Sequence, residues 1–103
     1  MIETQNMDTE IAAKALKELG HPTRLTLFRV LVKAGRNGLP VGHLQEVLQI
    51  PNSTLSHHLA SLMSAGLVKQ HREGRVLHCI PQFDCLDGLI QFLQEECCSG
   101  ESC

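Results

Sequence analysis

The sequence predicts one small domain that is mainly α-helical and contains a single β-hairpin. Its 103 residues suffice for one core, which must be largely aliphatic because aromatic residues make up only 3% of the chain. Apolar residues recur at helical spacing in five segments, and one further segment alternates around a glycine. Because so small a domain buries a limited share of its surface, we expect a second subunit to cover part of it.

Two helices are expected in the first third of the chain. Apolar residues at helical spacing predict a helix over residues 10–19, which ends where Gly20 and Pro22 interrupt the pattern. A second helix over residues 23–34 has a broad apolar face and ends at Gly35. Each helix therefore has one face that must pack against the rest of the domain.

Two more helices, over residues 39–49 and from the next turn through Ala65, are predicted on either side of residues 50–52. Pro51 breaks the helical pattern there, and the short side chain of Asn52 or Ser53 is expected to cap the fourth helix. The residues of these two helices expected to face inward are Val41, Leu44, Val47, Leu48, Leu55, Leu59, Leu62 and Met63.

A hairpin and a last helix complete the domain. Residues 67–71 and 76–80 read as strands around residues 72–75, where Gly74 can supply the positive φ of the turn. A helix over residues 84–96 is expected to carry Cys85 in a packing role near its start. Its apolar stripe consists of Leu86, Leu89, Ile90 and Leu93.

Charge is distributed unevenly along the chain. The formal net charge is −2, yet residues 21–83 contain seven Lys and Arg against two acidic residues, a net charge of +5, and all six histidines. The other acidic residues lie towards the two ends. The basic middle can face the phosphates of a nucleic acid, and an ordinary solvated surface is the alternative that charge alone leaves open.

Two short helices joined by a tight turn and followed directly by a basic hairpin are the parts of a winged helix-turn-helix, which binds double-stranded DNA. Short polar side chains of the fourth helix can reach phosphates or base edges in a major groove, and arginines of the hairpin can contact the flanking backbone. Because this helix has no Lys or Arg, affinity should depend on flanking charge and on salt. The candidate DNA-binding residues are Ser53, Thr54, Ser56, His57, Arg72 and Arg75.

The candidate DNA-binding residues have structural alternatives. Ser53 and Thr54 can cap the fourth helix instead of contacting DNA, or can do both. The two arginines can belong to an ordinary solvated turn. His58 precedes an inward-facing leucine and is interpreted as a half-buried histidine that is hydrogen-bonded within the domain, whereas His57 points outward.

Two stretches, LGHPTRLTLFRVL and STLSHHLASLMSAGLVKQHREGR, resemble the ArsR/SmtB family of metal-responsive repressors. Over about residues 10–97, the HPTRL segment, the S-x-x-S-H-H-L helix and the junction from GLV to the hairpin follow one another at family-like spacing. This resemblance implies a homodimer built by the first and last helices. It also implies repression that is lifted when an inducer binds.

The cysteines bear on the identity of that inducer. Arsenic sensors of this family carry a Cys-x-Cys pair at the start of the third helix, which is absent here, and no histidine follows His78 to complete the family's zinc site on the last helix. What remains is a cluster of Cys97, Cys98 and Cys103, which resembles that of arsenite-responsive members with three cysteines at the end of the last helix. Three thiolates suit trivalent arsenic or antimony, whereas structural zinc prefers a fourth ligand.

Cys79 on the hairpin is the rival third ligand, because the family often has an aromatic residue there. A small buried hydrophobe is the alternative interpretation of Cys79. If Cys79 pairs with Cys97 or Cys98, the two thiolates would suit a methylated trivalent arsenical. Thiol oxidation as a redox switch, and zinc or cadmium as the inducer, are the other readings of these cysteines.

Other function classes are not expected. No nucleophile, base and orienting group stand together as in an enzyme, and no catalytic cofactor is implied. No apolar run reaches the roughly 20 residues that span a bilayer, and no export signal is recognised, so we expect a cytoplasmic protein whose thiols bind metals or sense redox state. The expected organisation is a DNA-binding and dimerisation domain over residues 1–96 and a cysteine-rich tail over residues 97–103.

Overall fold

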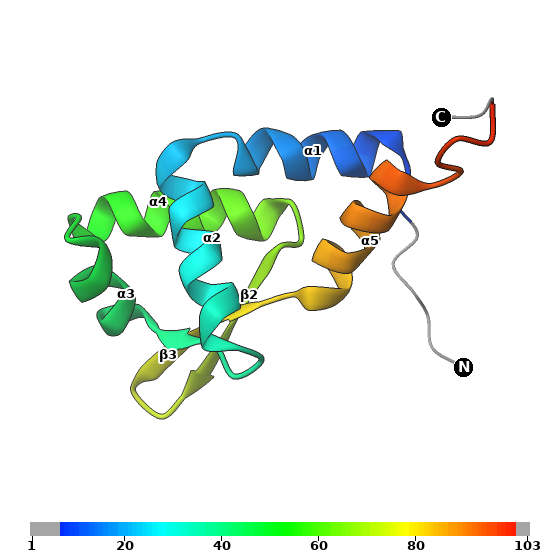
Figure 1. The fold of residues 1–103 in the computed structure, drawn as a ribbon. Coiled ribbons are helices and arrows are strands. Elements are labelled where there is room, and N and C mark those ends of the chain that lie inside the picture. Colours follow the sequence, from blue (N-terminus) through cyan, green and yellow to red (C-terminus); the bar gives the residue numbers. More distant parts are fainter. Residues whose placement is uncertain (1–6, 101–103) are drawn as a thin grey trace.

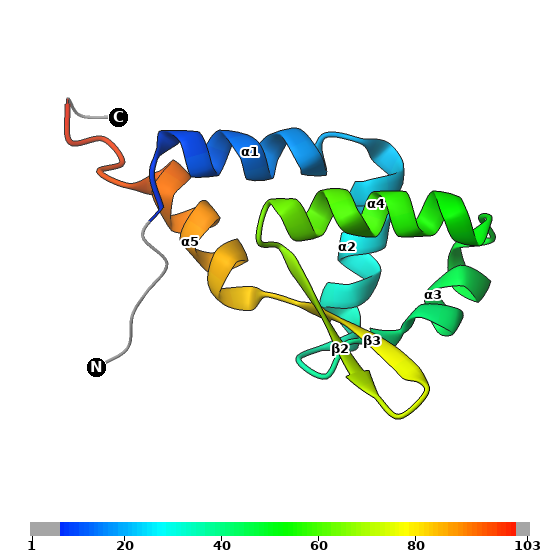
Figure 2. The same cartoon turned by 180° about the vertical axis from the view of Figure 1, so that it is seen from behind.

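The computed structural model describes residues 7–100 and confirms the mainly α-helical class with a β-hairpin (Figure 1). α1 and α4 lie side by side, α2 runs across them, and α3 and the tip of the hairpin lie far from α5 (Figures 1 and 2). The elements are α1 Thr9–Leu19, α2 Pro22–Ala34, β1 Leu39–Pro40, α3 Val41–Leu48, α4 Asn52–Ser64, β2 Val68–Glu73, β3 Val76–Pro81 and α5 Phe83–Gln94.

Local side-chain signals define the starts of the first two helices. The Oδ1 atom of Asp8 accepts a hydrogen bond from the backbone N–H of Ile11 at 2.9 Å, and Nδ1 of His21 accepts one from that of Thr23 at 3.1 Å. Pro22 occupies the first turn of α2, where its missing N–H has no partner to lose. Both helices agree with the sequence prediction to within one residue.

The third helix begins two residues later than predicted, because Leu39 and Pro40 form a short strand. β1 pairs antiparallel with β3, with Leu39 opposite Cys79, in a sheet of order β1-β3-β2. The approach is so close that a side chain at Gly38 would collide with the backbone of Cys79. The prediction that Val47 faces inward is also wrong, since Val47 is 48% exposed.

The predicted cap of α4 is absent from the structure. Pro51 occupies the N-cap position and no side chain caps the helix, so neither Asn52 nor Ser53 has the capping role expected of it. Leu55, Leu59 and Leu62 are buried as predicted. Met63 is 38% exposed, and the prediction that it belongs to the core is wrong, although its neighbour Leu62 is fully buried.

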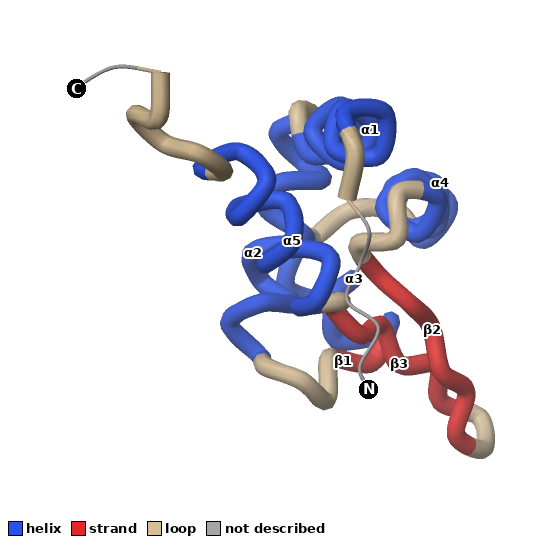
Figure 3. The backbone as a smooth tube through the Cα atoms, turned by 90° about the vertical axis from the view of Figure 1, so that its right-hand side faces the viewer, coloured by secondary structure: helices blue, strands red, loops and turns tan. Residues whose placement is uncertain are grey.

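The hairpin is longer than the sequence suggested. Its strands pair from Val68 opposite Pro81 to Glu73 opposite Val76, so only Gly74 and Arg75 form the turn. Gly74 has φ of +66°, a conformation that favours glycine. The hairpin projects away from the helices as a wing (Figure 3). The winged helix-turn-helix prediction is therefore confirmed at the level of fold.

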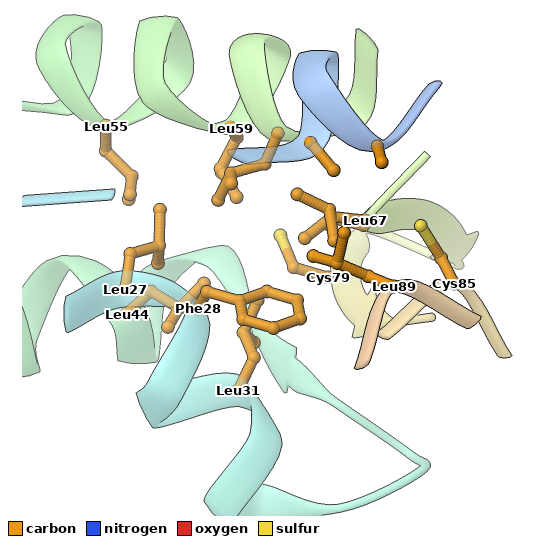
Figure 4. Packing of buried hydrophobic residues seen from close by; sticks show 14 residues of the cluster. Leu27, Phe28, Leu31, Leu44, Leu55, Leu59, Leu67, Cys79, Cys85 and Leu89 are labelled. Carbon is orange, nitrogen blue, oxygen red and sulfur yellow. The ribbon is translucent and has the colours of Figure 1, made fainter. Parts of the chain in front are cut away.

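One hydrophobic core joins the helices to the inner side of the sheet (Figure 4). Each fully buried leucine contributes roughly 1.5–3 kcal/mol relative to an exposed one. The largest fully buried side chains are Leu27, Leu31, Leu44, Leu55, Leu59, Leu62, Leu67, Val68 and Cys79.

The last helix buries only part of its apolar stripe. Leu89 is buried, but Ile90 and Leu93 are 48% and 60% exposed. The helix ends at Gln94, before the predicted Glu96, because the backbone leaves helical geometry at Glu95. Within residues 7–100, no helix combines the length and the apolar character that crossing a membrane requires.

Candidate nucleic-acid interface

α3, a tight turn and α4 form the helix-turn-helix. Gln49 ends α3 in the left-handed conformation at φ of +57°, and Pro51 then directs the chain into α4. No side chain caps α4, so the amides of its first turn are available to an anion outside the domain. The predicted contact residues of this helix, all exposed, are Ser53, Thr54, Ser56 and His57.

The wing carries both predicted arginines in exposed positions. Arg72 lies near the end of β2 opposite Leu77, and Arg75 lies in the turn itself. Lys69 and His71 are exposed on the same strand, although the sequence reasoning did not select them. Their signal was the alternation of exposed residues along β2, which depends on a register that the sequence alone did not fix.

Two of the seven cations of the basic middle contact other side chains of the domain. The guanidinium of Arg24 contacts Glu18, and that of Arg36 lies over the ring of Phe83, with its Cζ atom 5.2 Å from the ring centre. Like Arg36, the remaining five cations are exposed, and they are Arg29, Lys33, Lys69, Arg72 and Arg75. Arg24 is the one cation of the seven that is not exposed, so nearly all of the charge counted in the sequence, the wing included, is available to phosphates.

His58 is hydrogen-bonded within the domain, as predicted, but it is buried and not half-buried. It is 7% exposed, and its Nδ1 atom accepts a hydrogen bond from Nε of Arg24 at 3.3 Å. Burial lowers the pKa of His58, and the positive charges of His21, Arg24 and His57 lower it further. His57 is exposed on the outer side of α4, also as predicted.

Glu18 of α1 completes this buried group and was missed by the sequence reasoning. Its carboxylate accepts hydrogen bonds from Nη1 of Arg24 at 2.7 Å and from Nζ of Lys14 at 2.8 Å. The hydrogen bond from Lys14 holds the pKa of Glu18 below its ordinary value, against the opposing effect of burial. The spacing of Lys14 and Glu18 was visible in the sequence, but the contact with Arg24 was not.

The cysteines occupy two different environments. Sγ of Cys97 lies 3.4 Å from Sγ of Cys98, in the exposed segment after α5, and Cys103 lies outside the described residues. Cys79 and Cys85 are buried in the core, and burial raises the pKa of both thiols. In the part of the chain that the structure describes, no three His, Cys, Asp or Glu side chains are gathered as a metal site.

The packing role predicted for Cys85 is confirmed by its position. It is 3% exposed, and its Sγ donates to the carbonyl oxygen of Ala65 at 3.8 Å. Cys79 is fully buried on β3 and lies 3.7 Å from Nε2 of Gln70. A raised pKa makes loss of the thiol proton more costly, and burial restricts access to the sulfur, so both cysteines are poorer metal ligands than an exposed one.

Known proteins share this sequence pattern and this fold. A helix-turn-helix domain family matches residues 19–71, about half of the chain. The transcriptional repressor PagR of Bacillus anthracis is 31% identical over 87 residues, which cover 84% of this chain and 85% of PagR. The crystal structure of PagR superposes with a TM-score of 0.69 over 86% of this chain and 99% of that chain, at 29% identity.

Two other solved structures are similar over most of this chain. The homodimeric winged helix-turn-helix domain of Mb0332 from Mycobacterium bovis, a possible ArsR-family transcriptional regulator, has a TM-score of 0.66 and 28% identity, and covers 84% of this chain and 81% of its own. A possible transcriptional regulator for arsenical resistance has a TM-score of 0.68 and 27% identity, and covers 79% of this chain and 81% of its own.

Proposed function

Since the chain belongs to the ArsR family of winged helix-turn-helix transcriptional regulators, we propose that it is a homodimeric repressor that binds double-stranded operator DNA through α4 and the wing. One observation carries this proposal. The uncapped start of α4, with its exposed polar side chains, belongs to the same domain as a projecting wing with exposed Arg72 and Arg75. A winged helix-turn-helix binds DNA with two parts, a helix whose start enters the major groove and a basic wing beside it.

The two parts contribute differently to binding. Hydroxyl groups and the imidazole of His57 can donate to or accept from base edges, but α4 has no Lys or Arg for bidentate readout of guanine. The exposed arginines of the wing and the exposed cations of α2 supply attraction to phosphates. Affinity is therefore expected to fall steeply as salt rises, with modest sequence preference.

The proposed dimer uses the apolar surface that a single chain leaves uncovered. Leu16 on α1 is 45% exposed, and Ile90 and Leu93 on α5 are more exposed still. Burying these side chains against a second copy would remove apolar surface from water. The homodimeric state of the Mb0332 domain supports dimerisation of this chain. A two-fold dimer would present two α4 helices to half-sites about one helical turn of DNA apart.

The DNA interface is tested by fluorescence anisotropy with a duplex from the promoter region of this protein's own gene. Arg72→Ala and Arg75→Ala are each expected to weaken binding and to lower the salt slope by about one. Lys17→Ala, which removes an exposed cation from α1, is the matched control and should bind like the wild type. The proposal would be contradicted if the wild-type protein did not bind the duplex in a buffer of low salt. It would also be contradicted if the wing variants bound like the wild type at two salt concentrations.

The proposed inducer is a trivalent arsenical held by Cys97, Cys98 and a third cysteine in their reduced form. The neighbouring sulfurs of Cys97 and Cys98 support this proposal, and so does the similarity to a possible regulator for arsenical resistance. Trivalent arsenic or antimony takes three sulfur ligands. Cys103 is preferred as the third ligand, because Cys79 would have to leave the core and lose a proton that burial holds on its sulfur. A methylated arsenical would need only two of these sulfurs.

A redox switch is the second candidate for the same sulfurs. The sulfurs of Cys97 and Cys98 are neighbours, so an oxidant that reaches one can also reach the other. Both cysteines follow α5, which carries exposed apolar residues of the proposed dimer surface. Release of the promoter duplex by arsenite and by hydrogen peroxide separates the two mechanisms. Cys97→Ser and Cys98→Ser are expected to keep DNA binding and to abolish release by arsenite. Release by arsenite that survives both substitutions would rule out this site.

A zinc or cadmium sensor is the third candidate and has less support. Zinc prefers four ligands, and the described residues contain no gathered set of three. Zinc is added to the same binding assay at the concentrations at which arsenite releases the promoter duplex. At these concentrations zinc is expected to leave the complex intact. Release by zinc alone would favour this candidate over the arsenical.

A further inference from the structure

Arg24 joins three helices through one side chain. It lies on α2, its Nη1 atom donates to Glu18 of α1 at 2.7 Å, and its Nε atom donates to Nδ1 of His58 on α4 at 3.3 Å. The side chains of Arg24 and Glu18 are only 15% and 8% exposed. Figures 1 and 2 show α1 and α4 side by side with α2 across them, so the guanidinium bridges a junction of all three.

The contact with His58 fixes α4 in a way that its leucines do not. Apolar packing is not directional, so the buried Leu55, Leu59 and Leu62 hold α4 against the core but define its rotation and axial position less sharply. A hydrogen bond from a charged guanidinium is directional and is stronger than a neutral one. Nδ1 of His58 must carry a lone pair to accept this bond, which fixes the neutral tautomer with the proton on Nε2.

His58 is placed to pass this constraint to the outer face of α4. The ring of the preceding residue, His57, lies 5.8 Å from that of His58, and the ring of His21 at the start of α2 lies 4.7 Å away. A displacement of α4 at His58 therefore moves the candidate DNA-binding side chains that share its backbone. At the other end of the chain of contacts, Glu18 belongs to α1, which is part of the proposed dimer surface.

We propose that Arg24 is a positioning residue for DNA recognition, which holds α4 in register with α1 through His58 and Glu18. The proposal rests on the proposed DNA interface and extends it. Because α1 belongs to the proposed dimer surface, holding α4 to α1 sets the placement of the two α4 helices relative to the dimer axis. A helix that is free to shift would meet its half-site in a range of orientations and lose affinity without losing any contact group.

Arg24→Lys tests this inference, because it keeps the positive charge and removes the planar group that reaches two partners. The promoter duplex is expected to bind about tenfold more weakly, the size of losing one hydrogen bond to a charged group. The salt slope should stay at the wild-type value, because no phosphate contact is lost. Lys17→Arg, which exchanges one cation for another at an exposed position of α1, is the matched control and should bind like the wild type.

Thermal unfolding of the same variants separates positioning from stability alone. A merely structural role would lower the melting temperature of Arg24→Lys and leave its affinity unchanged well below that temperature. Affinity within twofold of wild type under those conditions would overturn the inference, whether or not the melting temperature falls. If the wing variants also bound like the wild type, the DNA interface itself would fail, and the two failures are thereby distinguished.

A pair of substitutions at His58 provides an independent test. His58→Asn places an amide oxygen close to the position of Nδ1, so it can accept from Arg24 and is expected to bind the duplex nearly as well as the wild type. His58→Leu removes the acceptor and is expected to show the affinity loss of Arg24→Lys. Combining His58→Leu with Arg24→Lys should add little further loss, because both break the same contact. Equal binding by the Asn and Leu variants, or losses that add in full, would contradict the proposal.

Discussion

The first two turns of α4 carry exposed polar side chains on their outer side, whereas the inner side of the helix joins three buried leucines to one buried histidine. A change on the outer side alters what α4 can contact. A change on the inner side alters how α4 sits in the domain. One helix therefore separates the chemistry of binding from the packing that positions it, and the two can be measured by different experiments.

The cysteines show the same contrast between buried and exposed positions. Cys79 and Cys85 lie in the core with raised pKa values, whereas Cys97 is exposed after α5. Burial makes the first two contribute to packing and protects them from soft metal ions and oxidants. Because Cys97 is exposed, soft metal ions and oxidants can reach its sulfur, and substituting it should change the free energy of unfolding little.

Among the substitutions considered, Leu59→Ala is expected to have the largest effect on the free energy of unfolding, because it disrupts the packing of the inner side of α4. Leu59 is 2% exposed, so its removal leaves a cavity and should lower the free energy of unfolding by roughly 2–5 kcal/mol. Urea denaturation measures this loss. His57→Ala, on the outer side of the same helix, should change the unfolding free energy by less than about 0.5 kcal/mol and weaken DNA binding instead. Equal destabilisation by the two substitutions would remove the distinction between the two sides.

Cys79→Ser is expected to have the next largest effect. The hydroxyl group would be buried where a weakly polar sulfur packs, and the expected loss is about 1–3 kcal/mol in urea denaturation. Cys97→Ser, at the exposed site, should cost less than about 0.5 kcal/mol and reduce the arsenite bound per subunit. Arsenite stoichiometry that falls for Cys79→Ser and not for Cys97→Ser would move the proposed site into the hairpin.

The outer side of α4 could be predicted from the sequence because its signals are local. A proline and a run of small polar residues mark the helix start, and leucines four and seven positions apart mark the face that packs. The wing was likewise indicated by alternation around Gly74. These patterns extend over a few residues, so a short window contains all the information they need.

The inner contacts could not be predicted in the same way. Arg24 and His58 are 34 residues apart, and nothing in either segment specifies that the two side chains meet. β1 was missed for the same reason, because Leu39 and Pro40 become a strand only through pairing with β3. The expected cap of α4 failed because Pro51, and not a short polar residue, occupies the N-cap position. Tertiary contacts override local propensity at the first two of these points, whereas the missing cap is a local matter of which residue precedes the helix.

The pH dependence of stability tests the inner side without altering its packing. The native pKa of His58 is lowered, so as pH falls below the ordinary histidine value of about 6.5 the unfolded chain takes up a proton that the native state resists. The free energy of unfolding should therefore fall between about pH 7 and pH 5, above the range where Glu18, whose pKa is also lowered, begins to matter. His58→Asn should flatten this slope in urea denaturation at several pH values. A matched His43→Asn variant, at an exposed position of α3 that does not act on His58, should keep the slope. An unchanged slope in the His58→Asn variant as well would contradict the assignment.

Ser53→Ala and Thr54→Ala are expected to have the smallest effect on stability. They test whether these two residues contact DNA or cap α4. A serine or threonine that caps a helix stabilises it by about 1 kcal/mol, but no side chain caps α4 here. Each substitution should therefore change the unfolding free energy by less than about 0.5 kcal/mol and still weaken binding to the promoter duplex. A loss near 1 kcal/mol with unchanged DNA affinity would make these residues caps rather than contacts. In that case only Ser56, His57 and the wing would contact DNA. Binding would then discriminate less between DNA sequences.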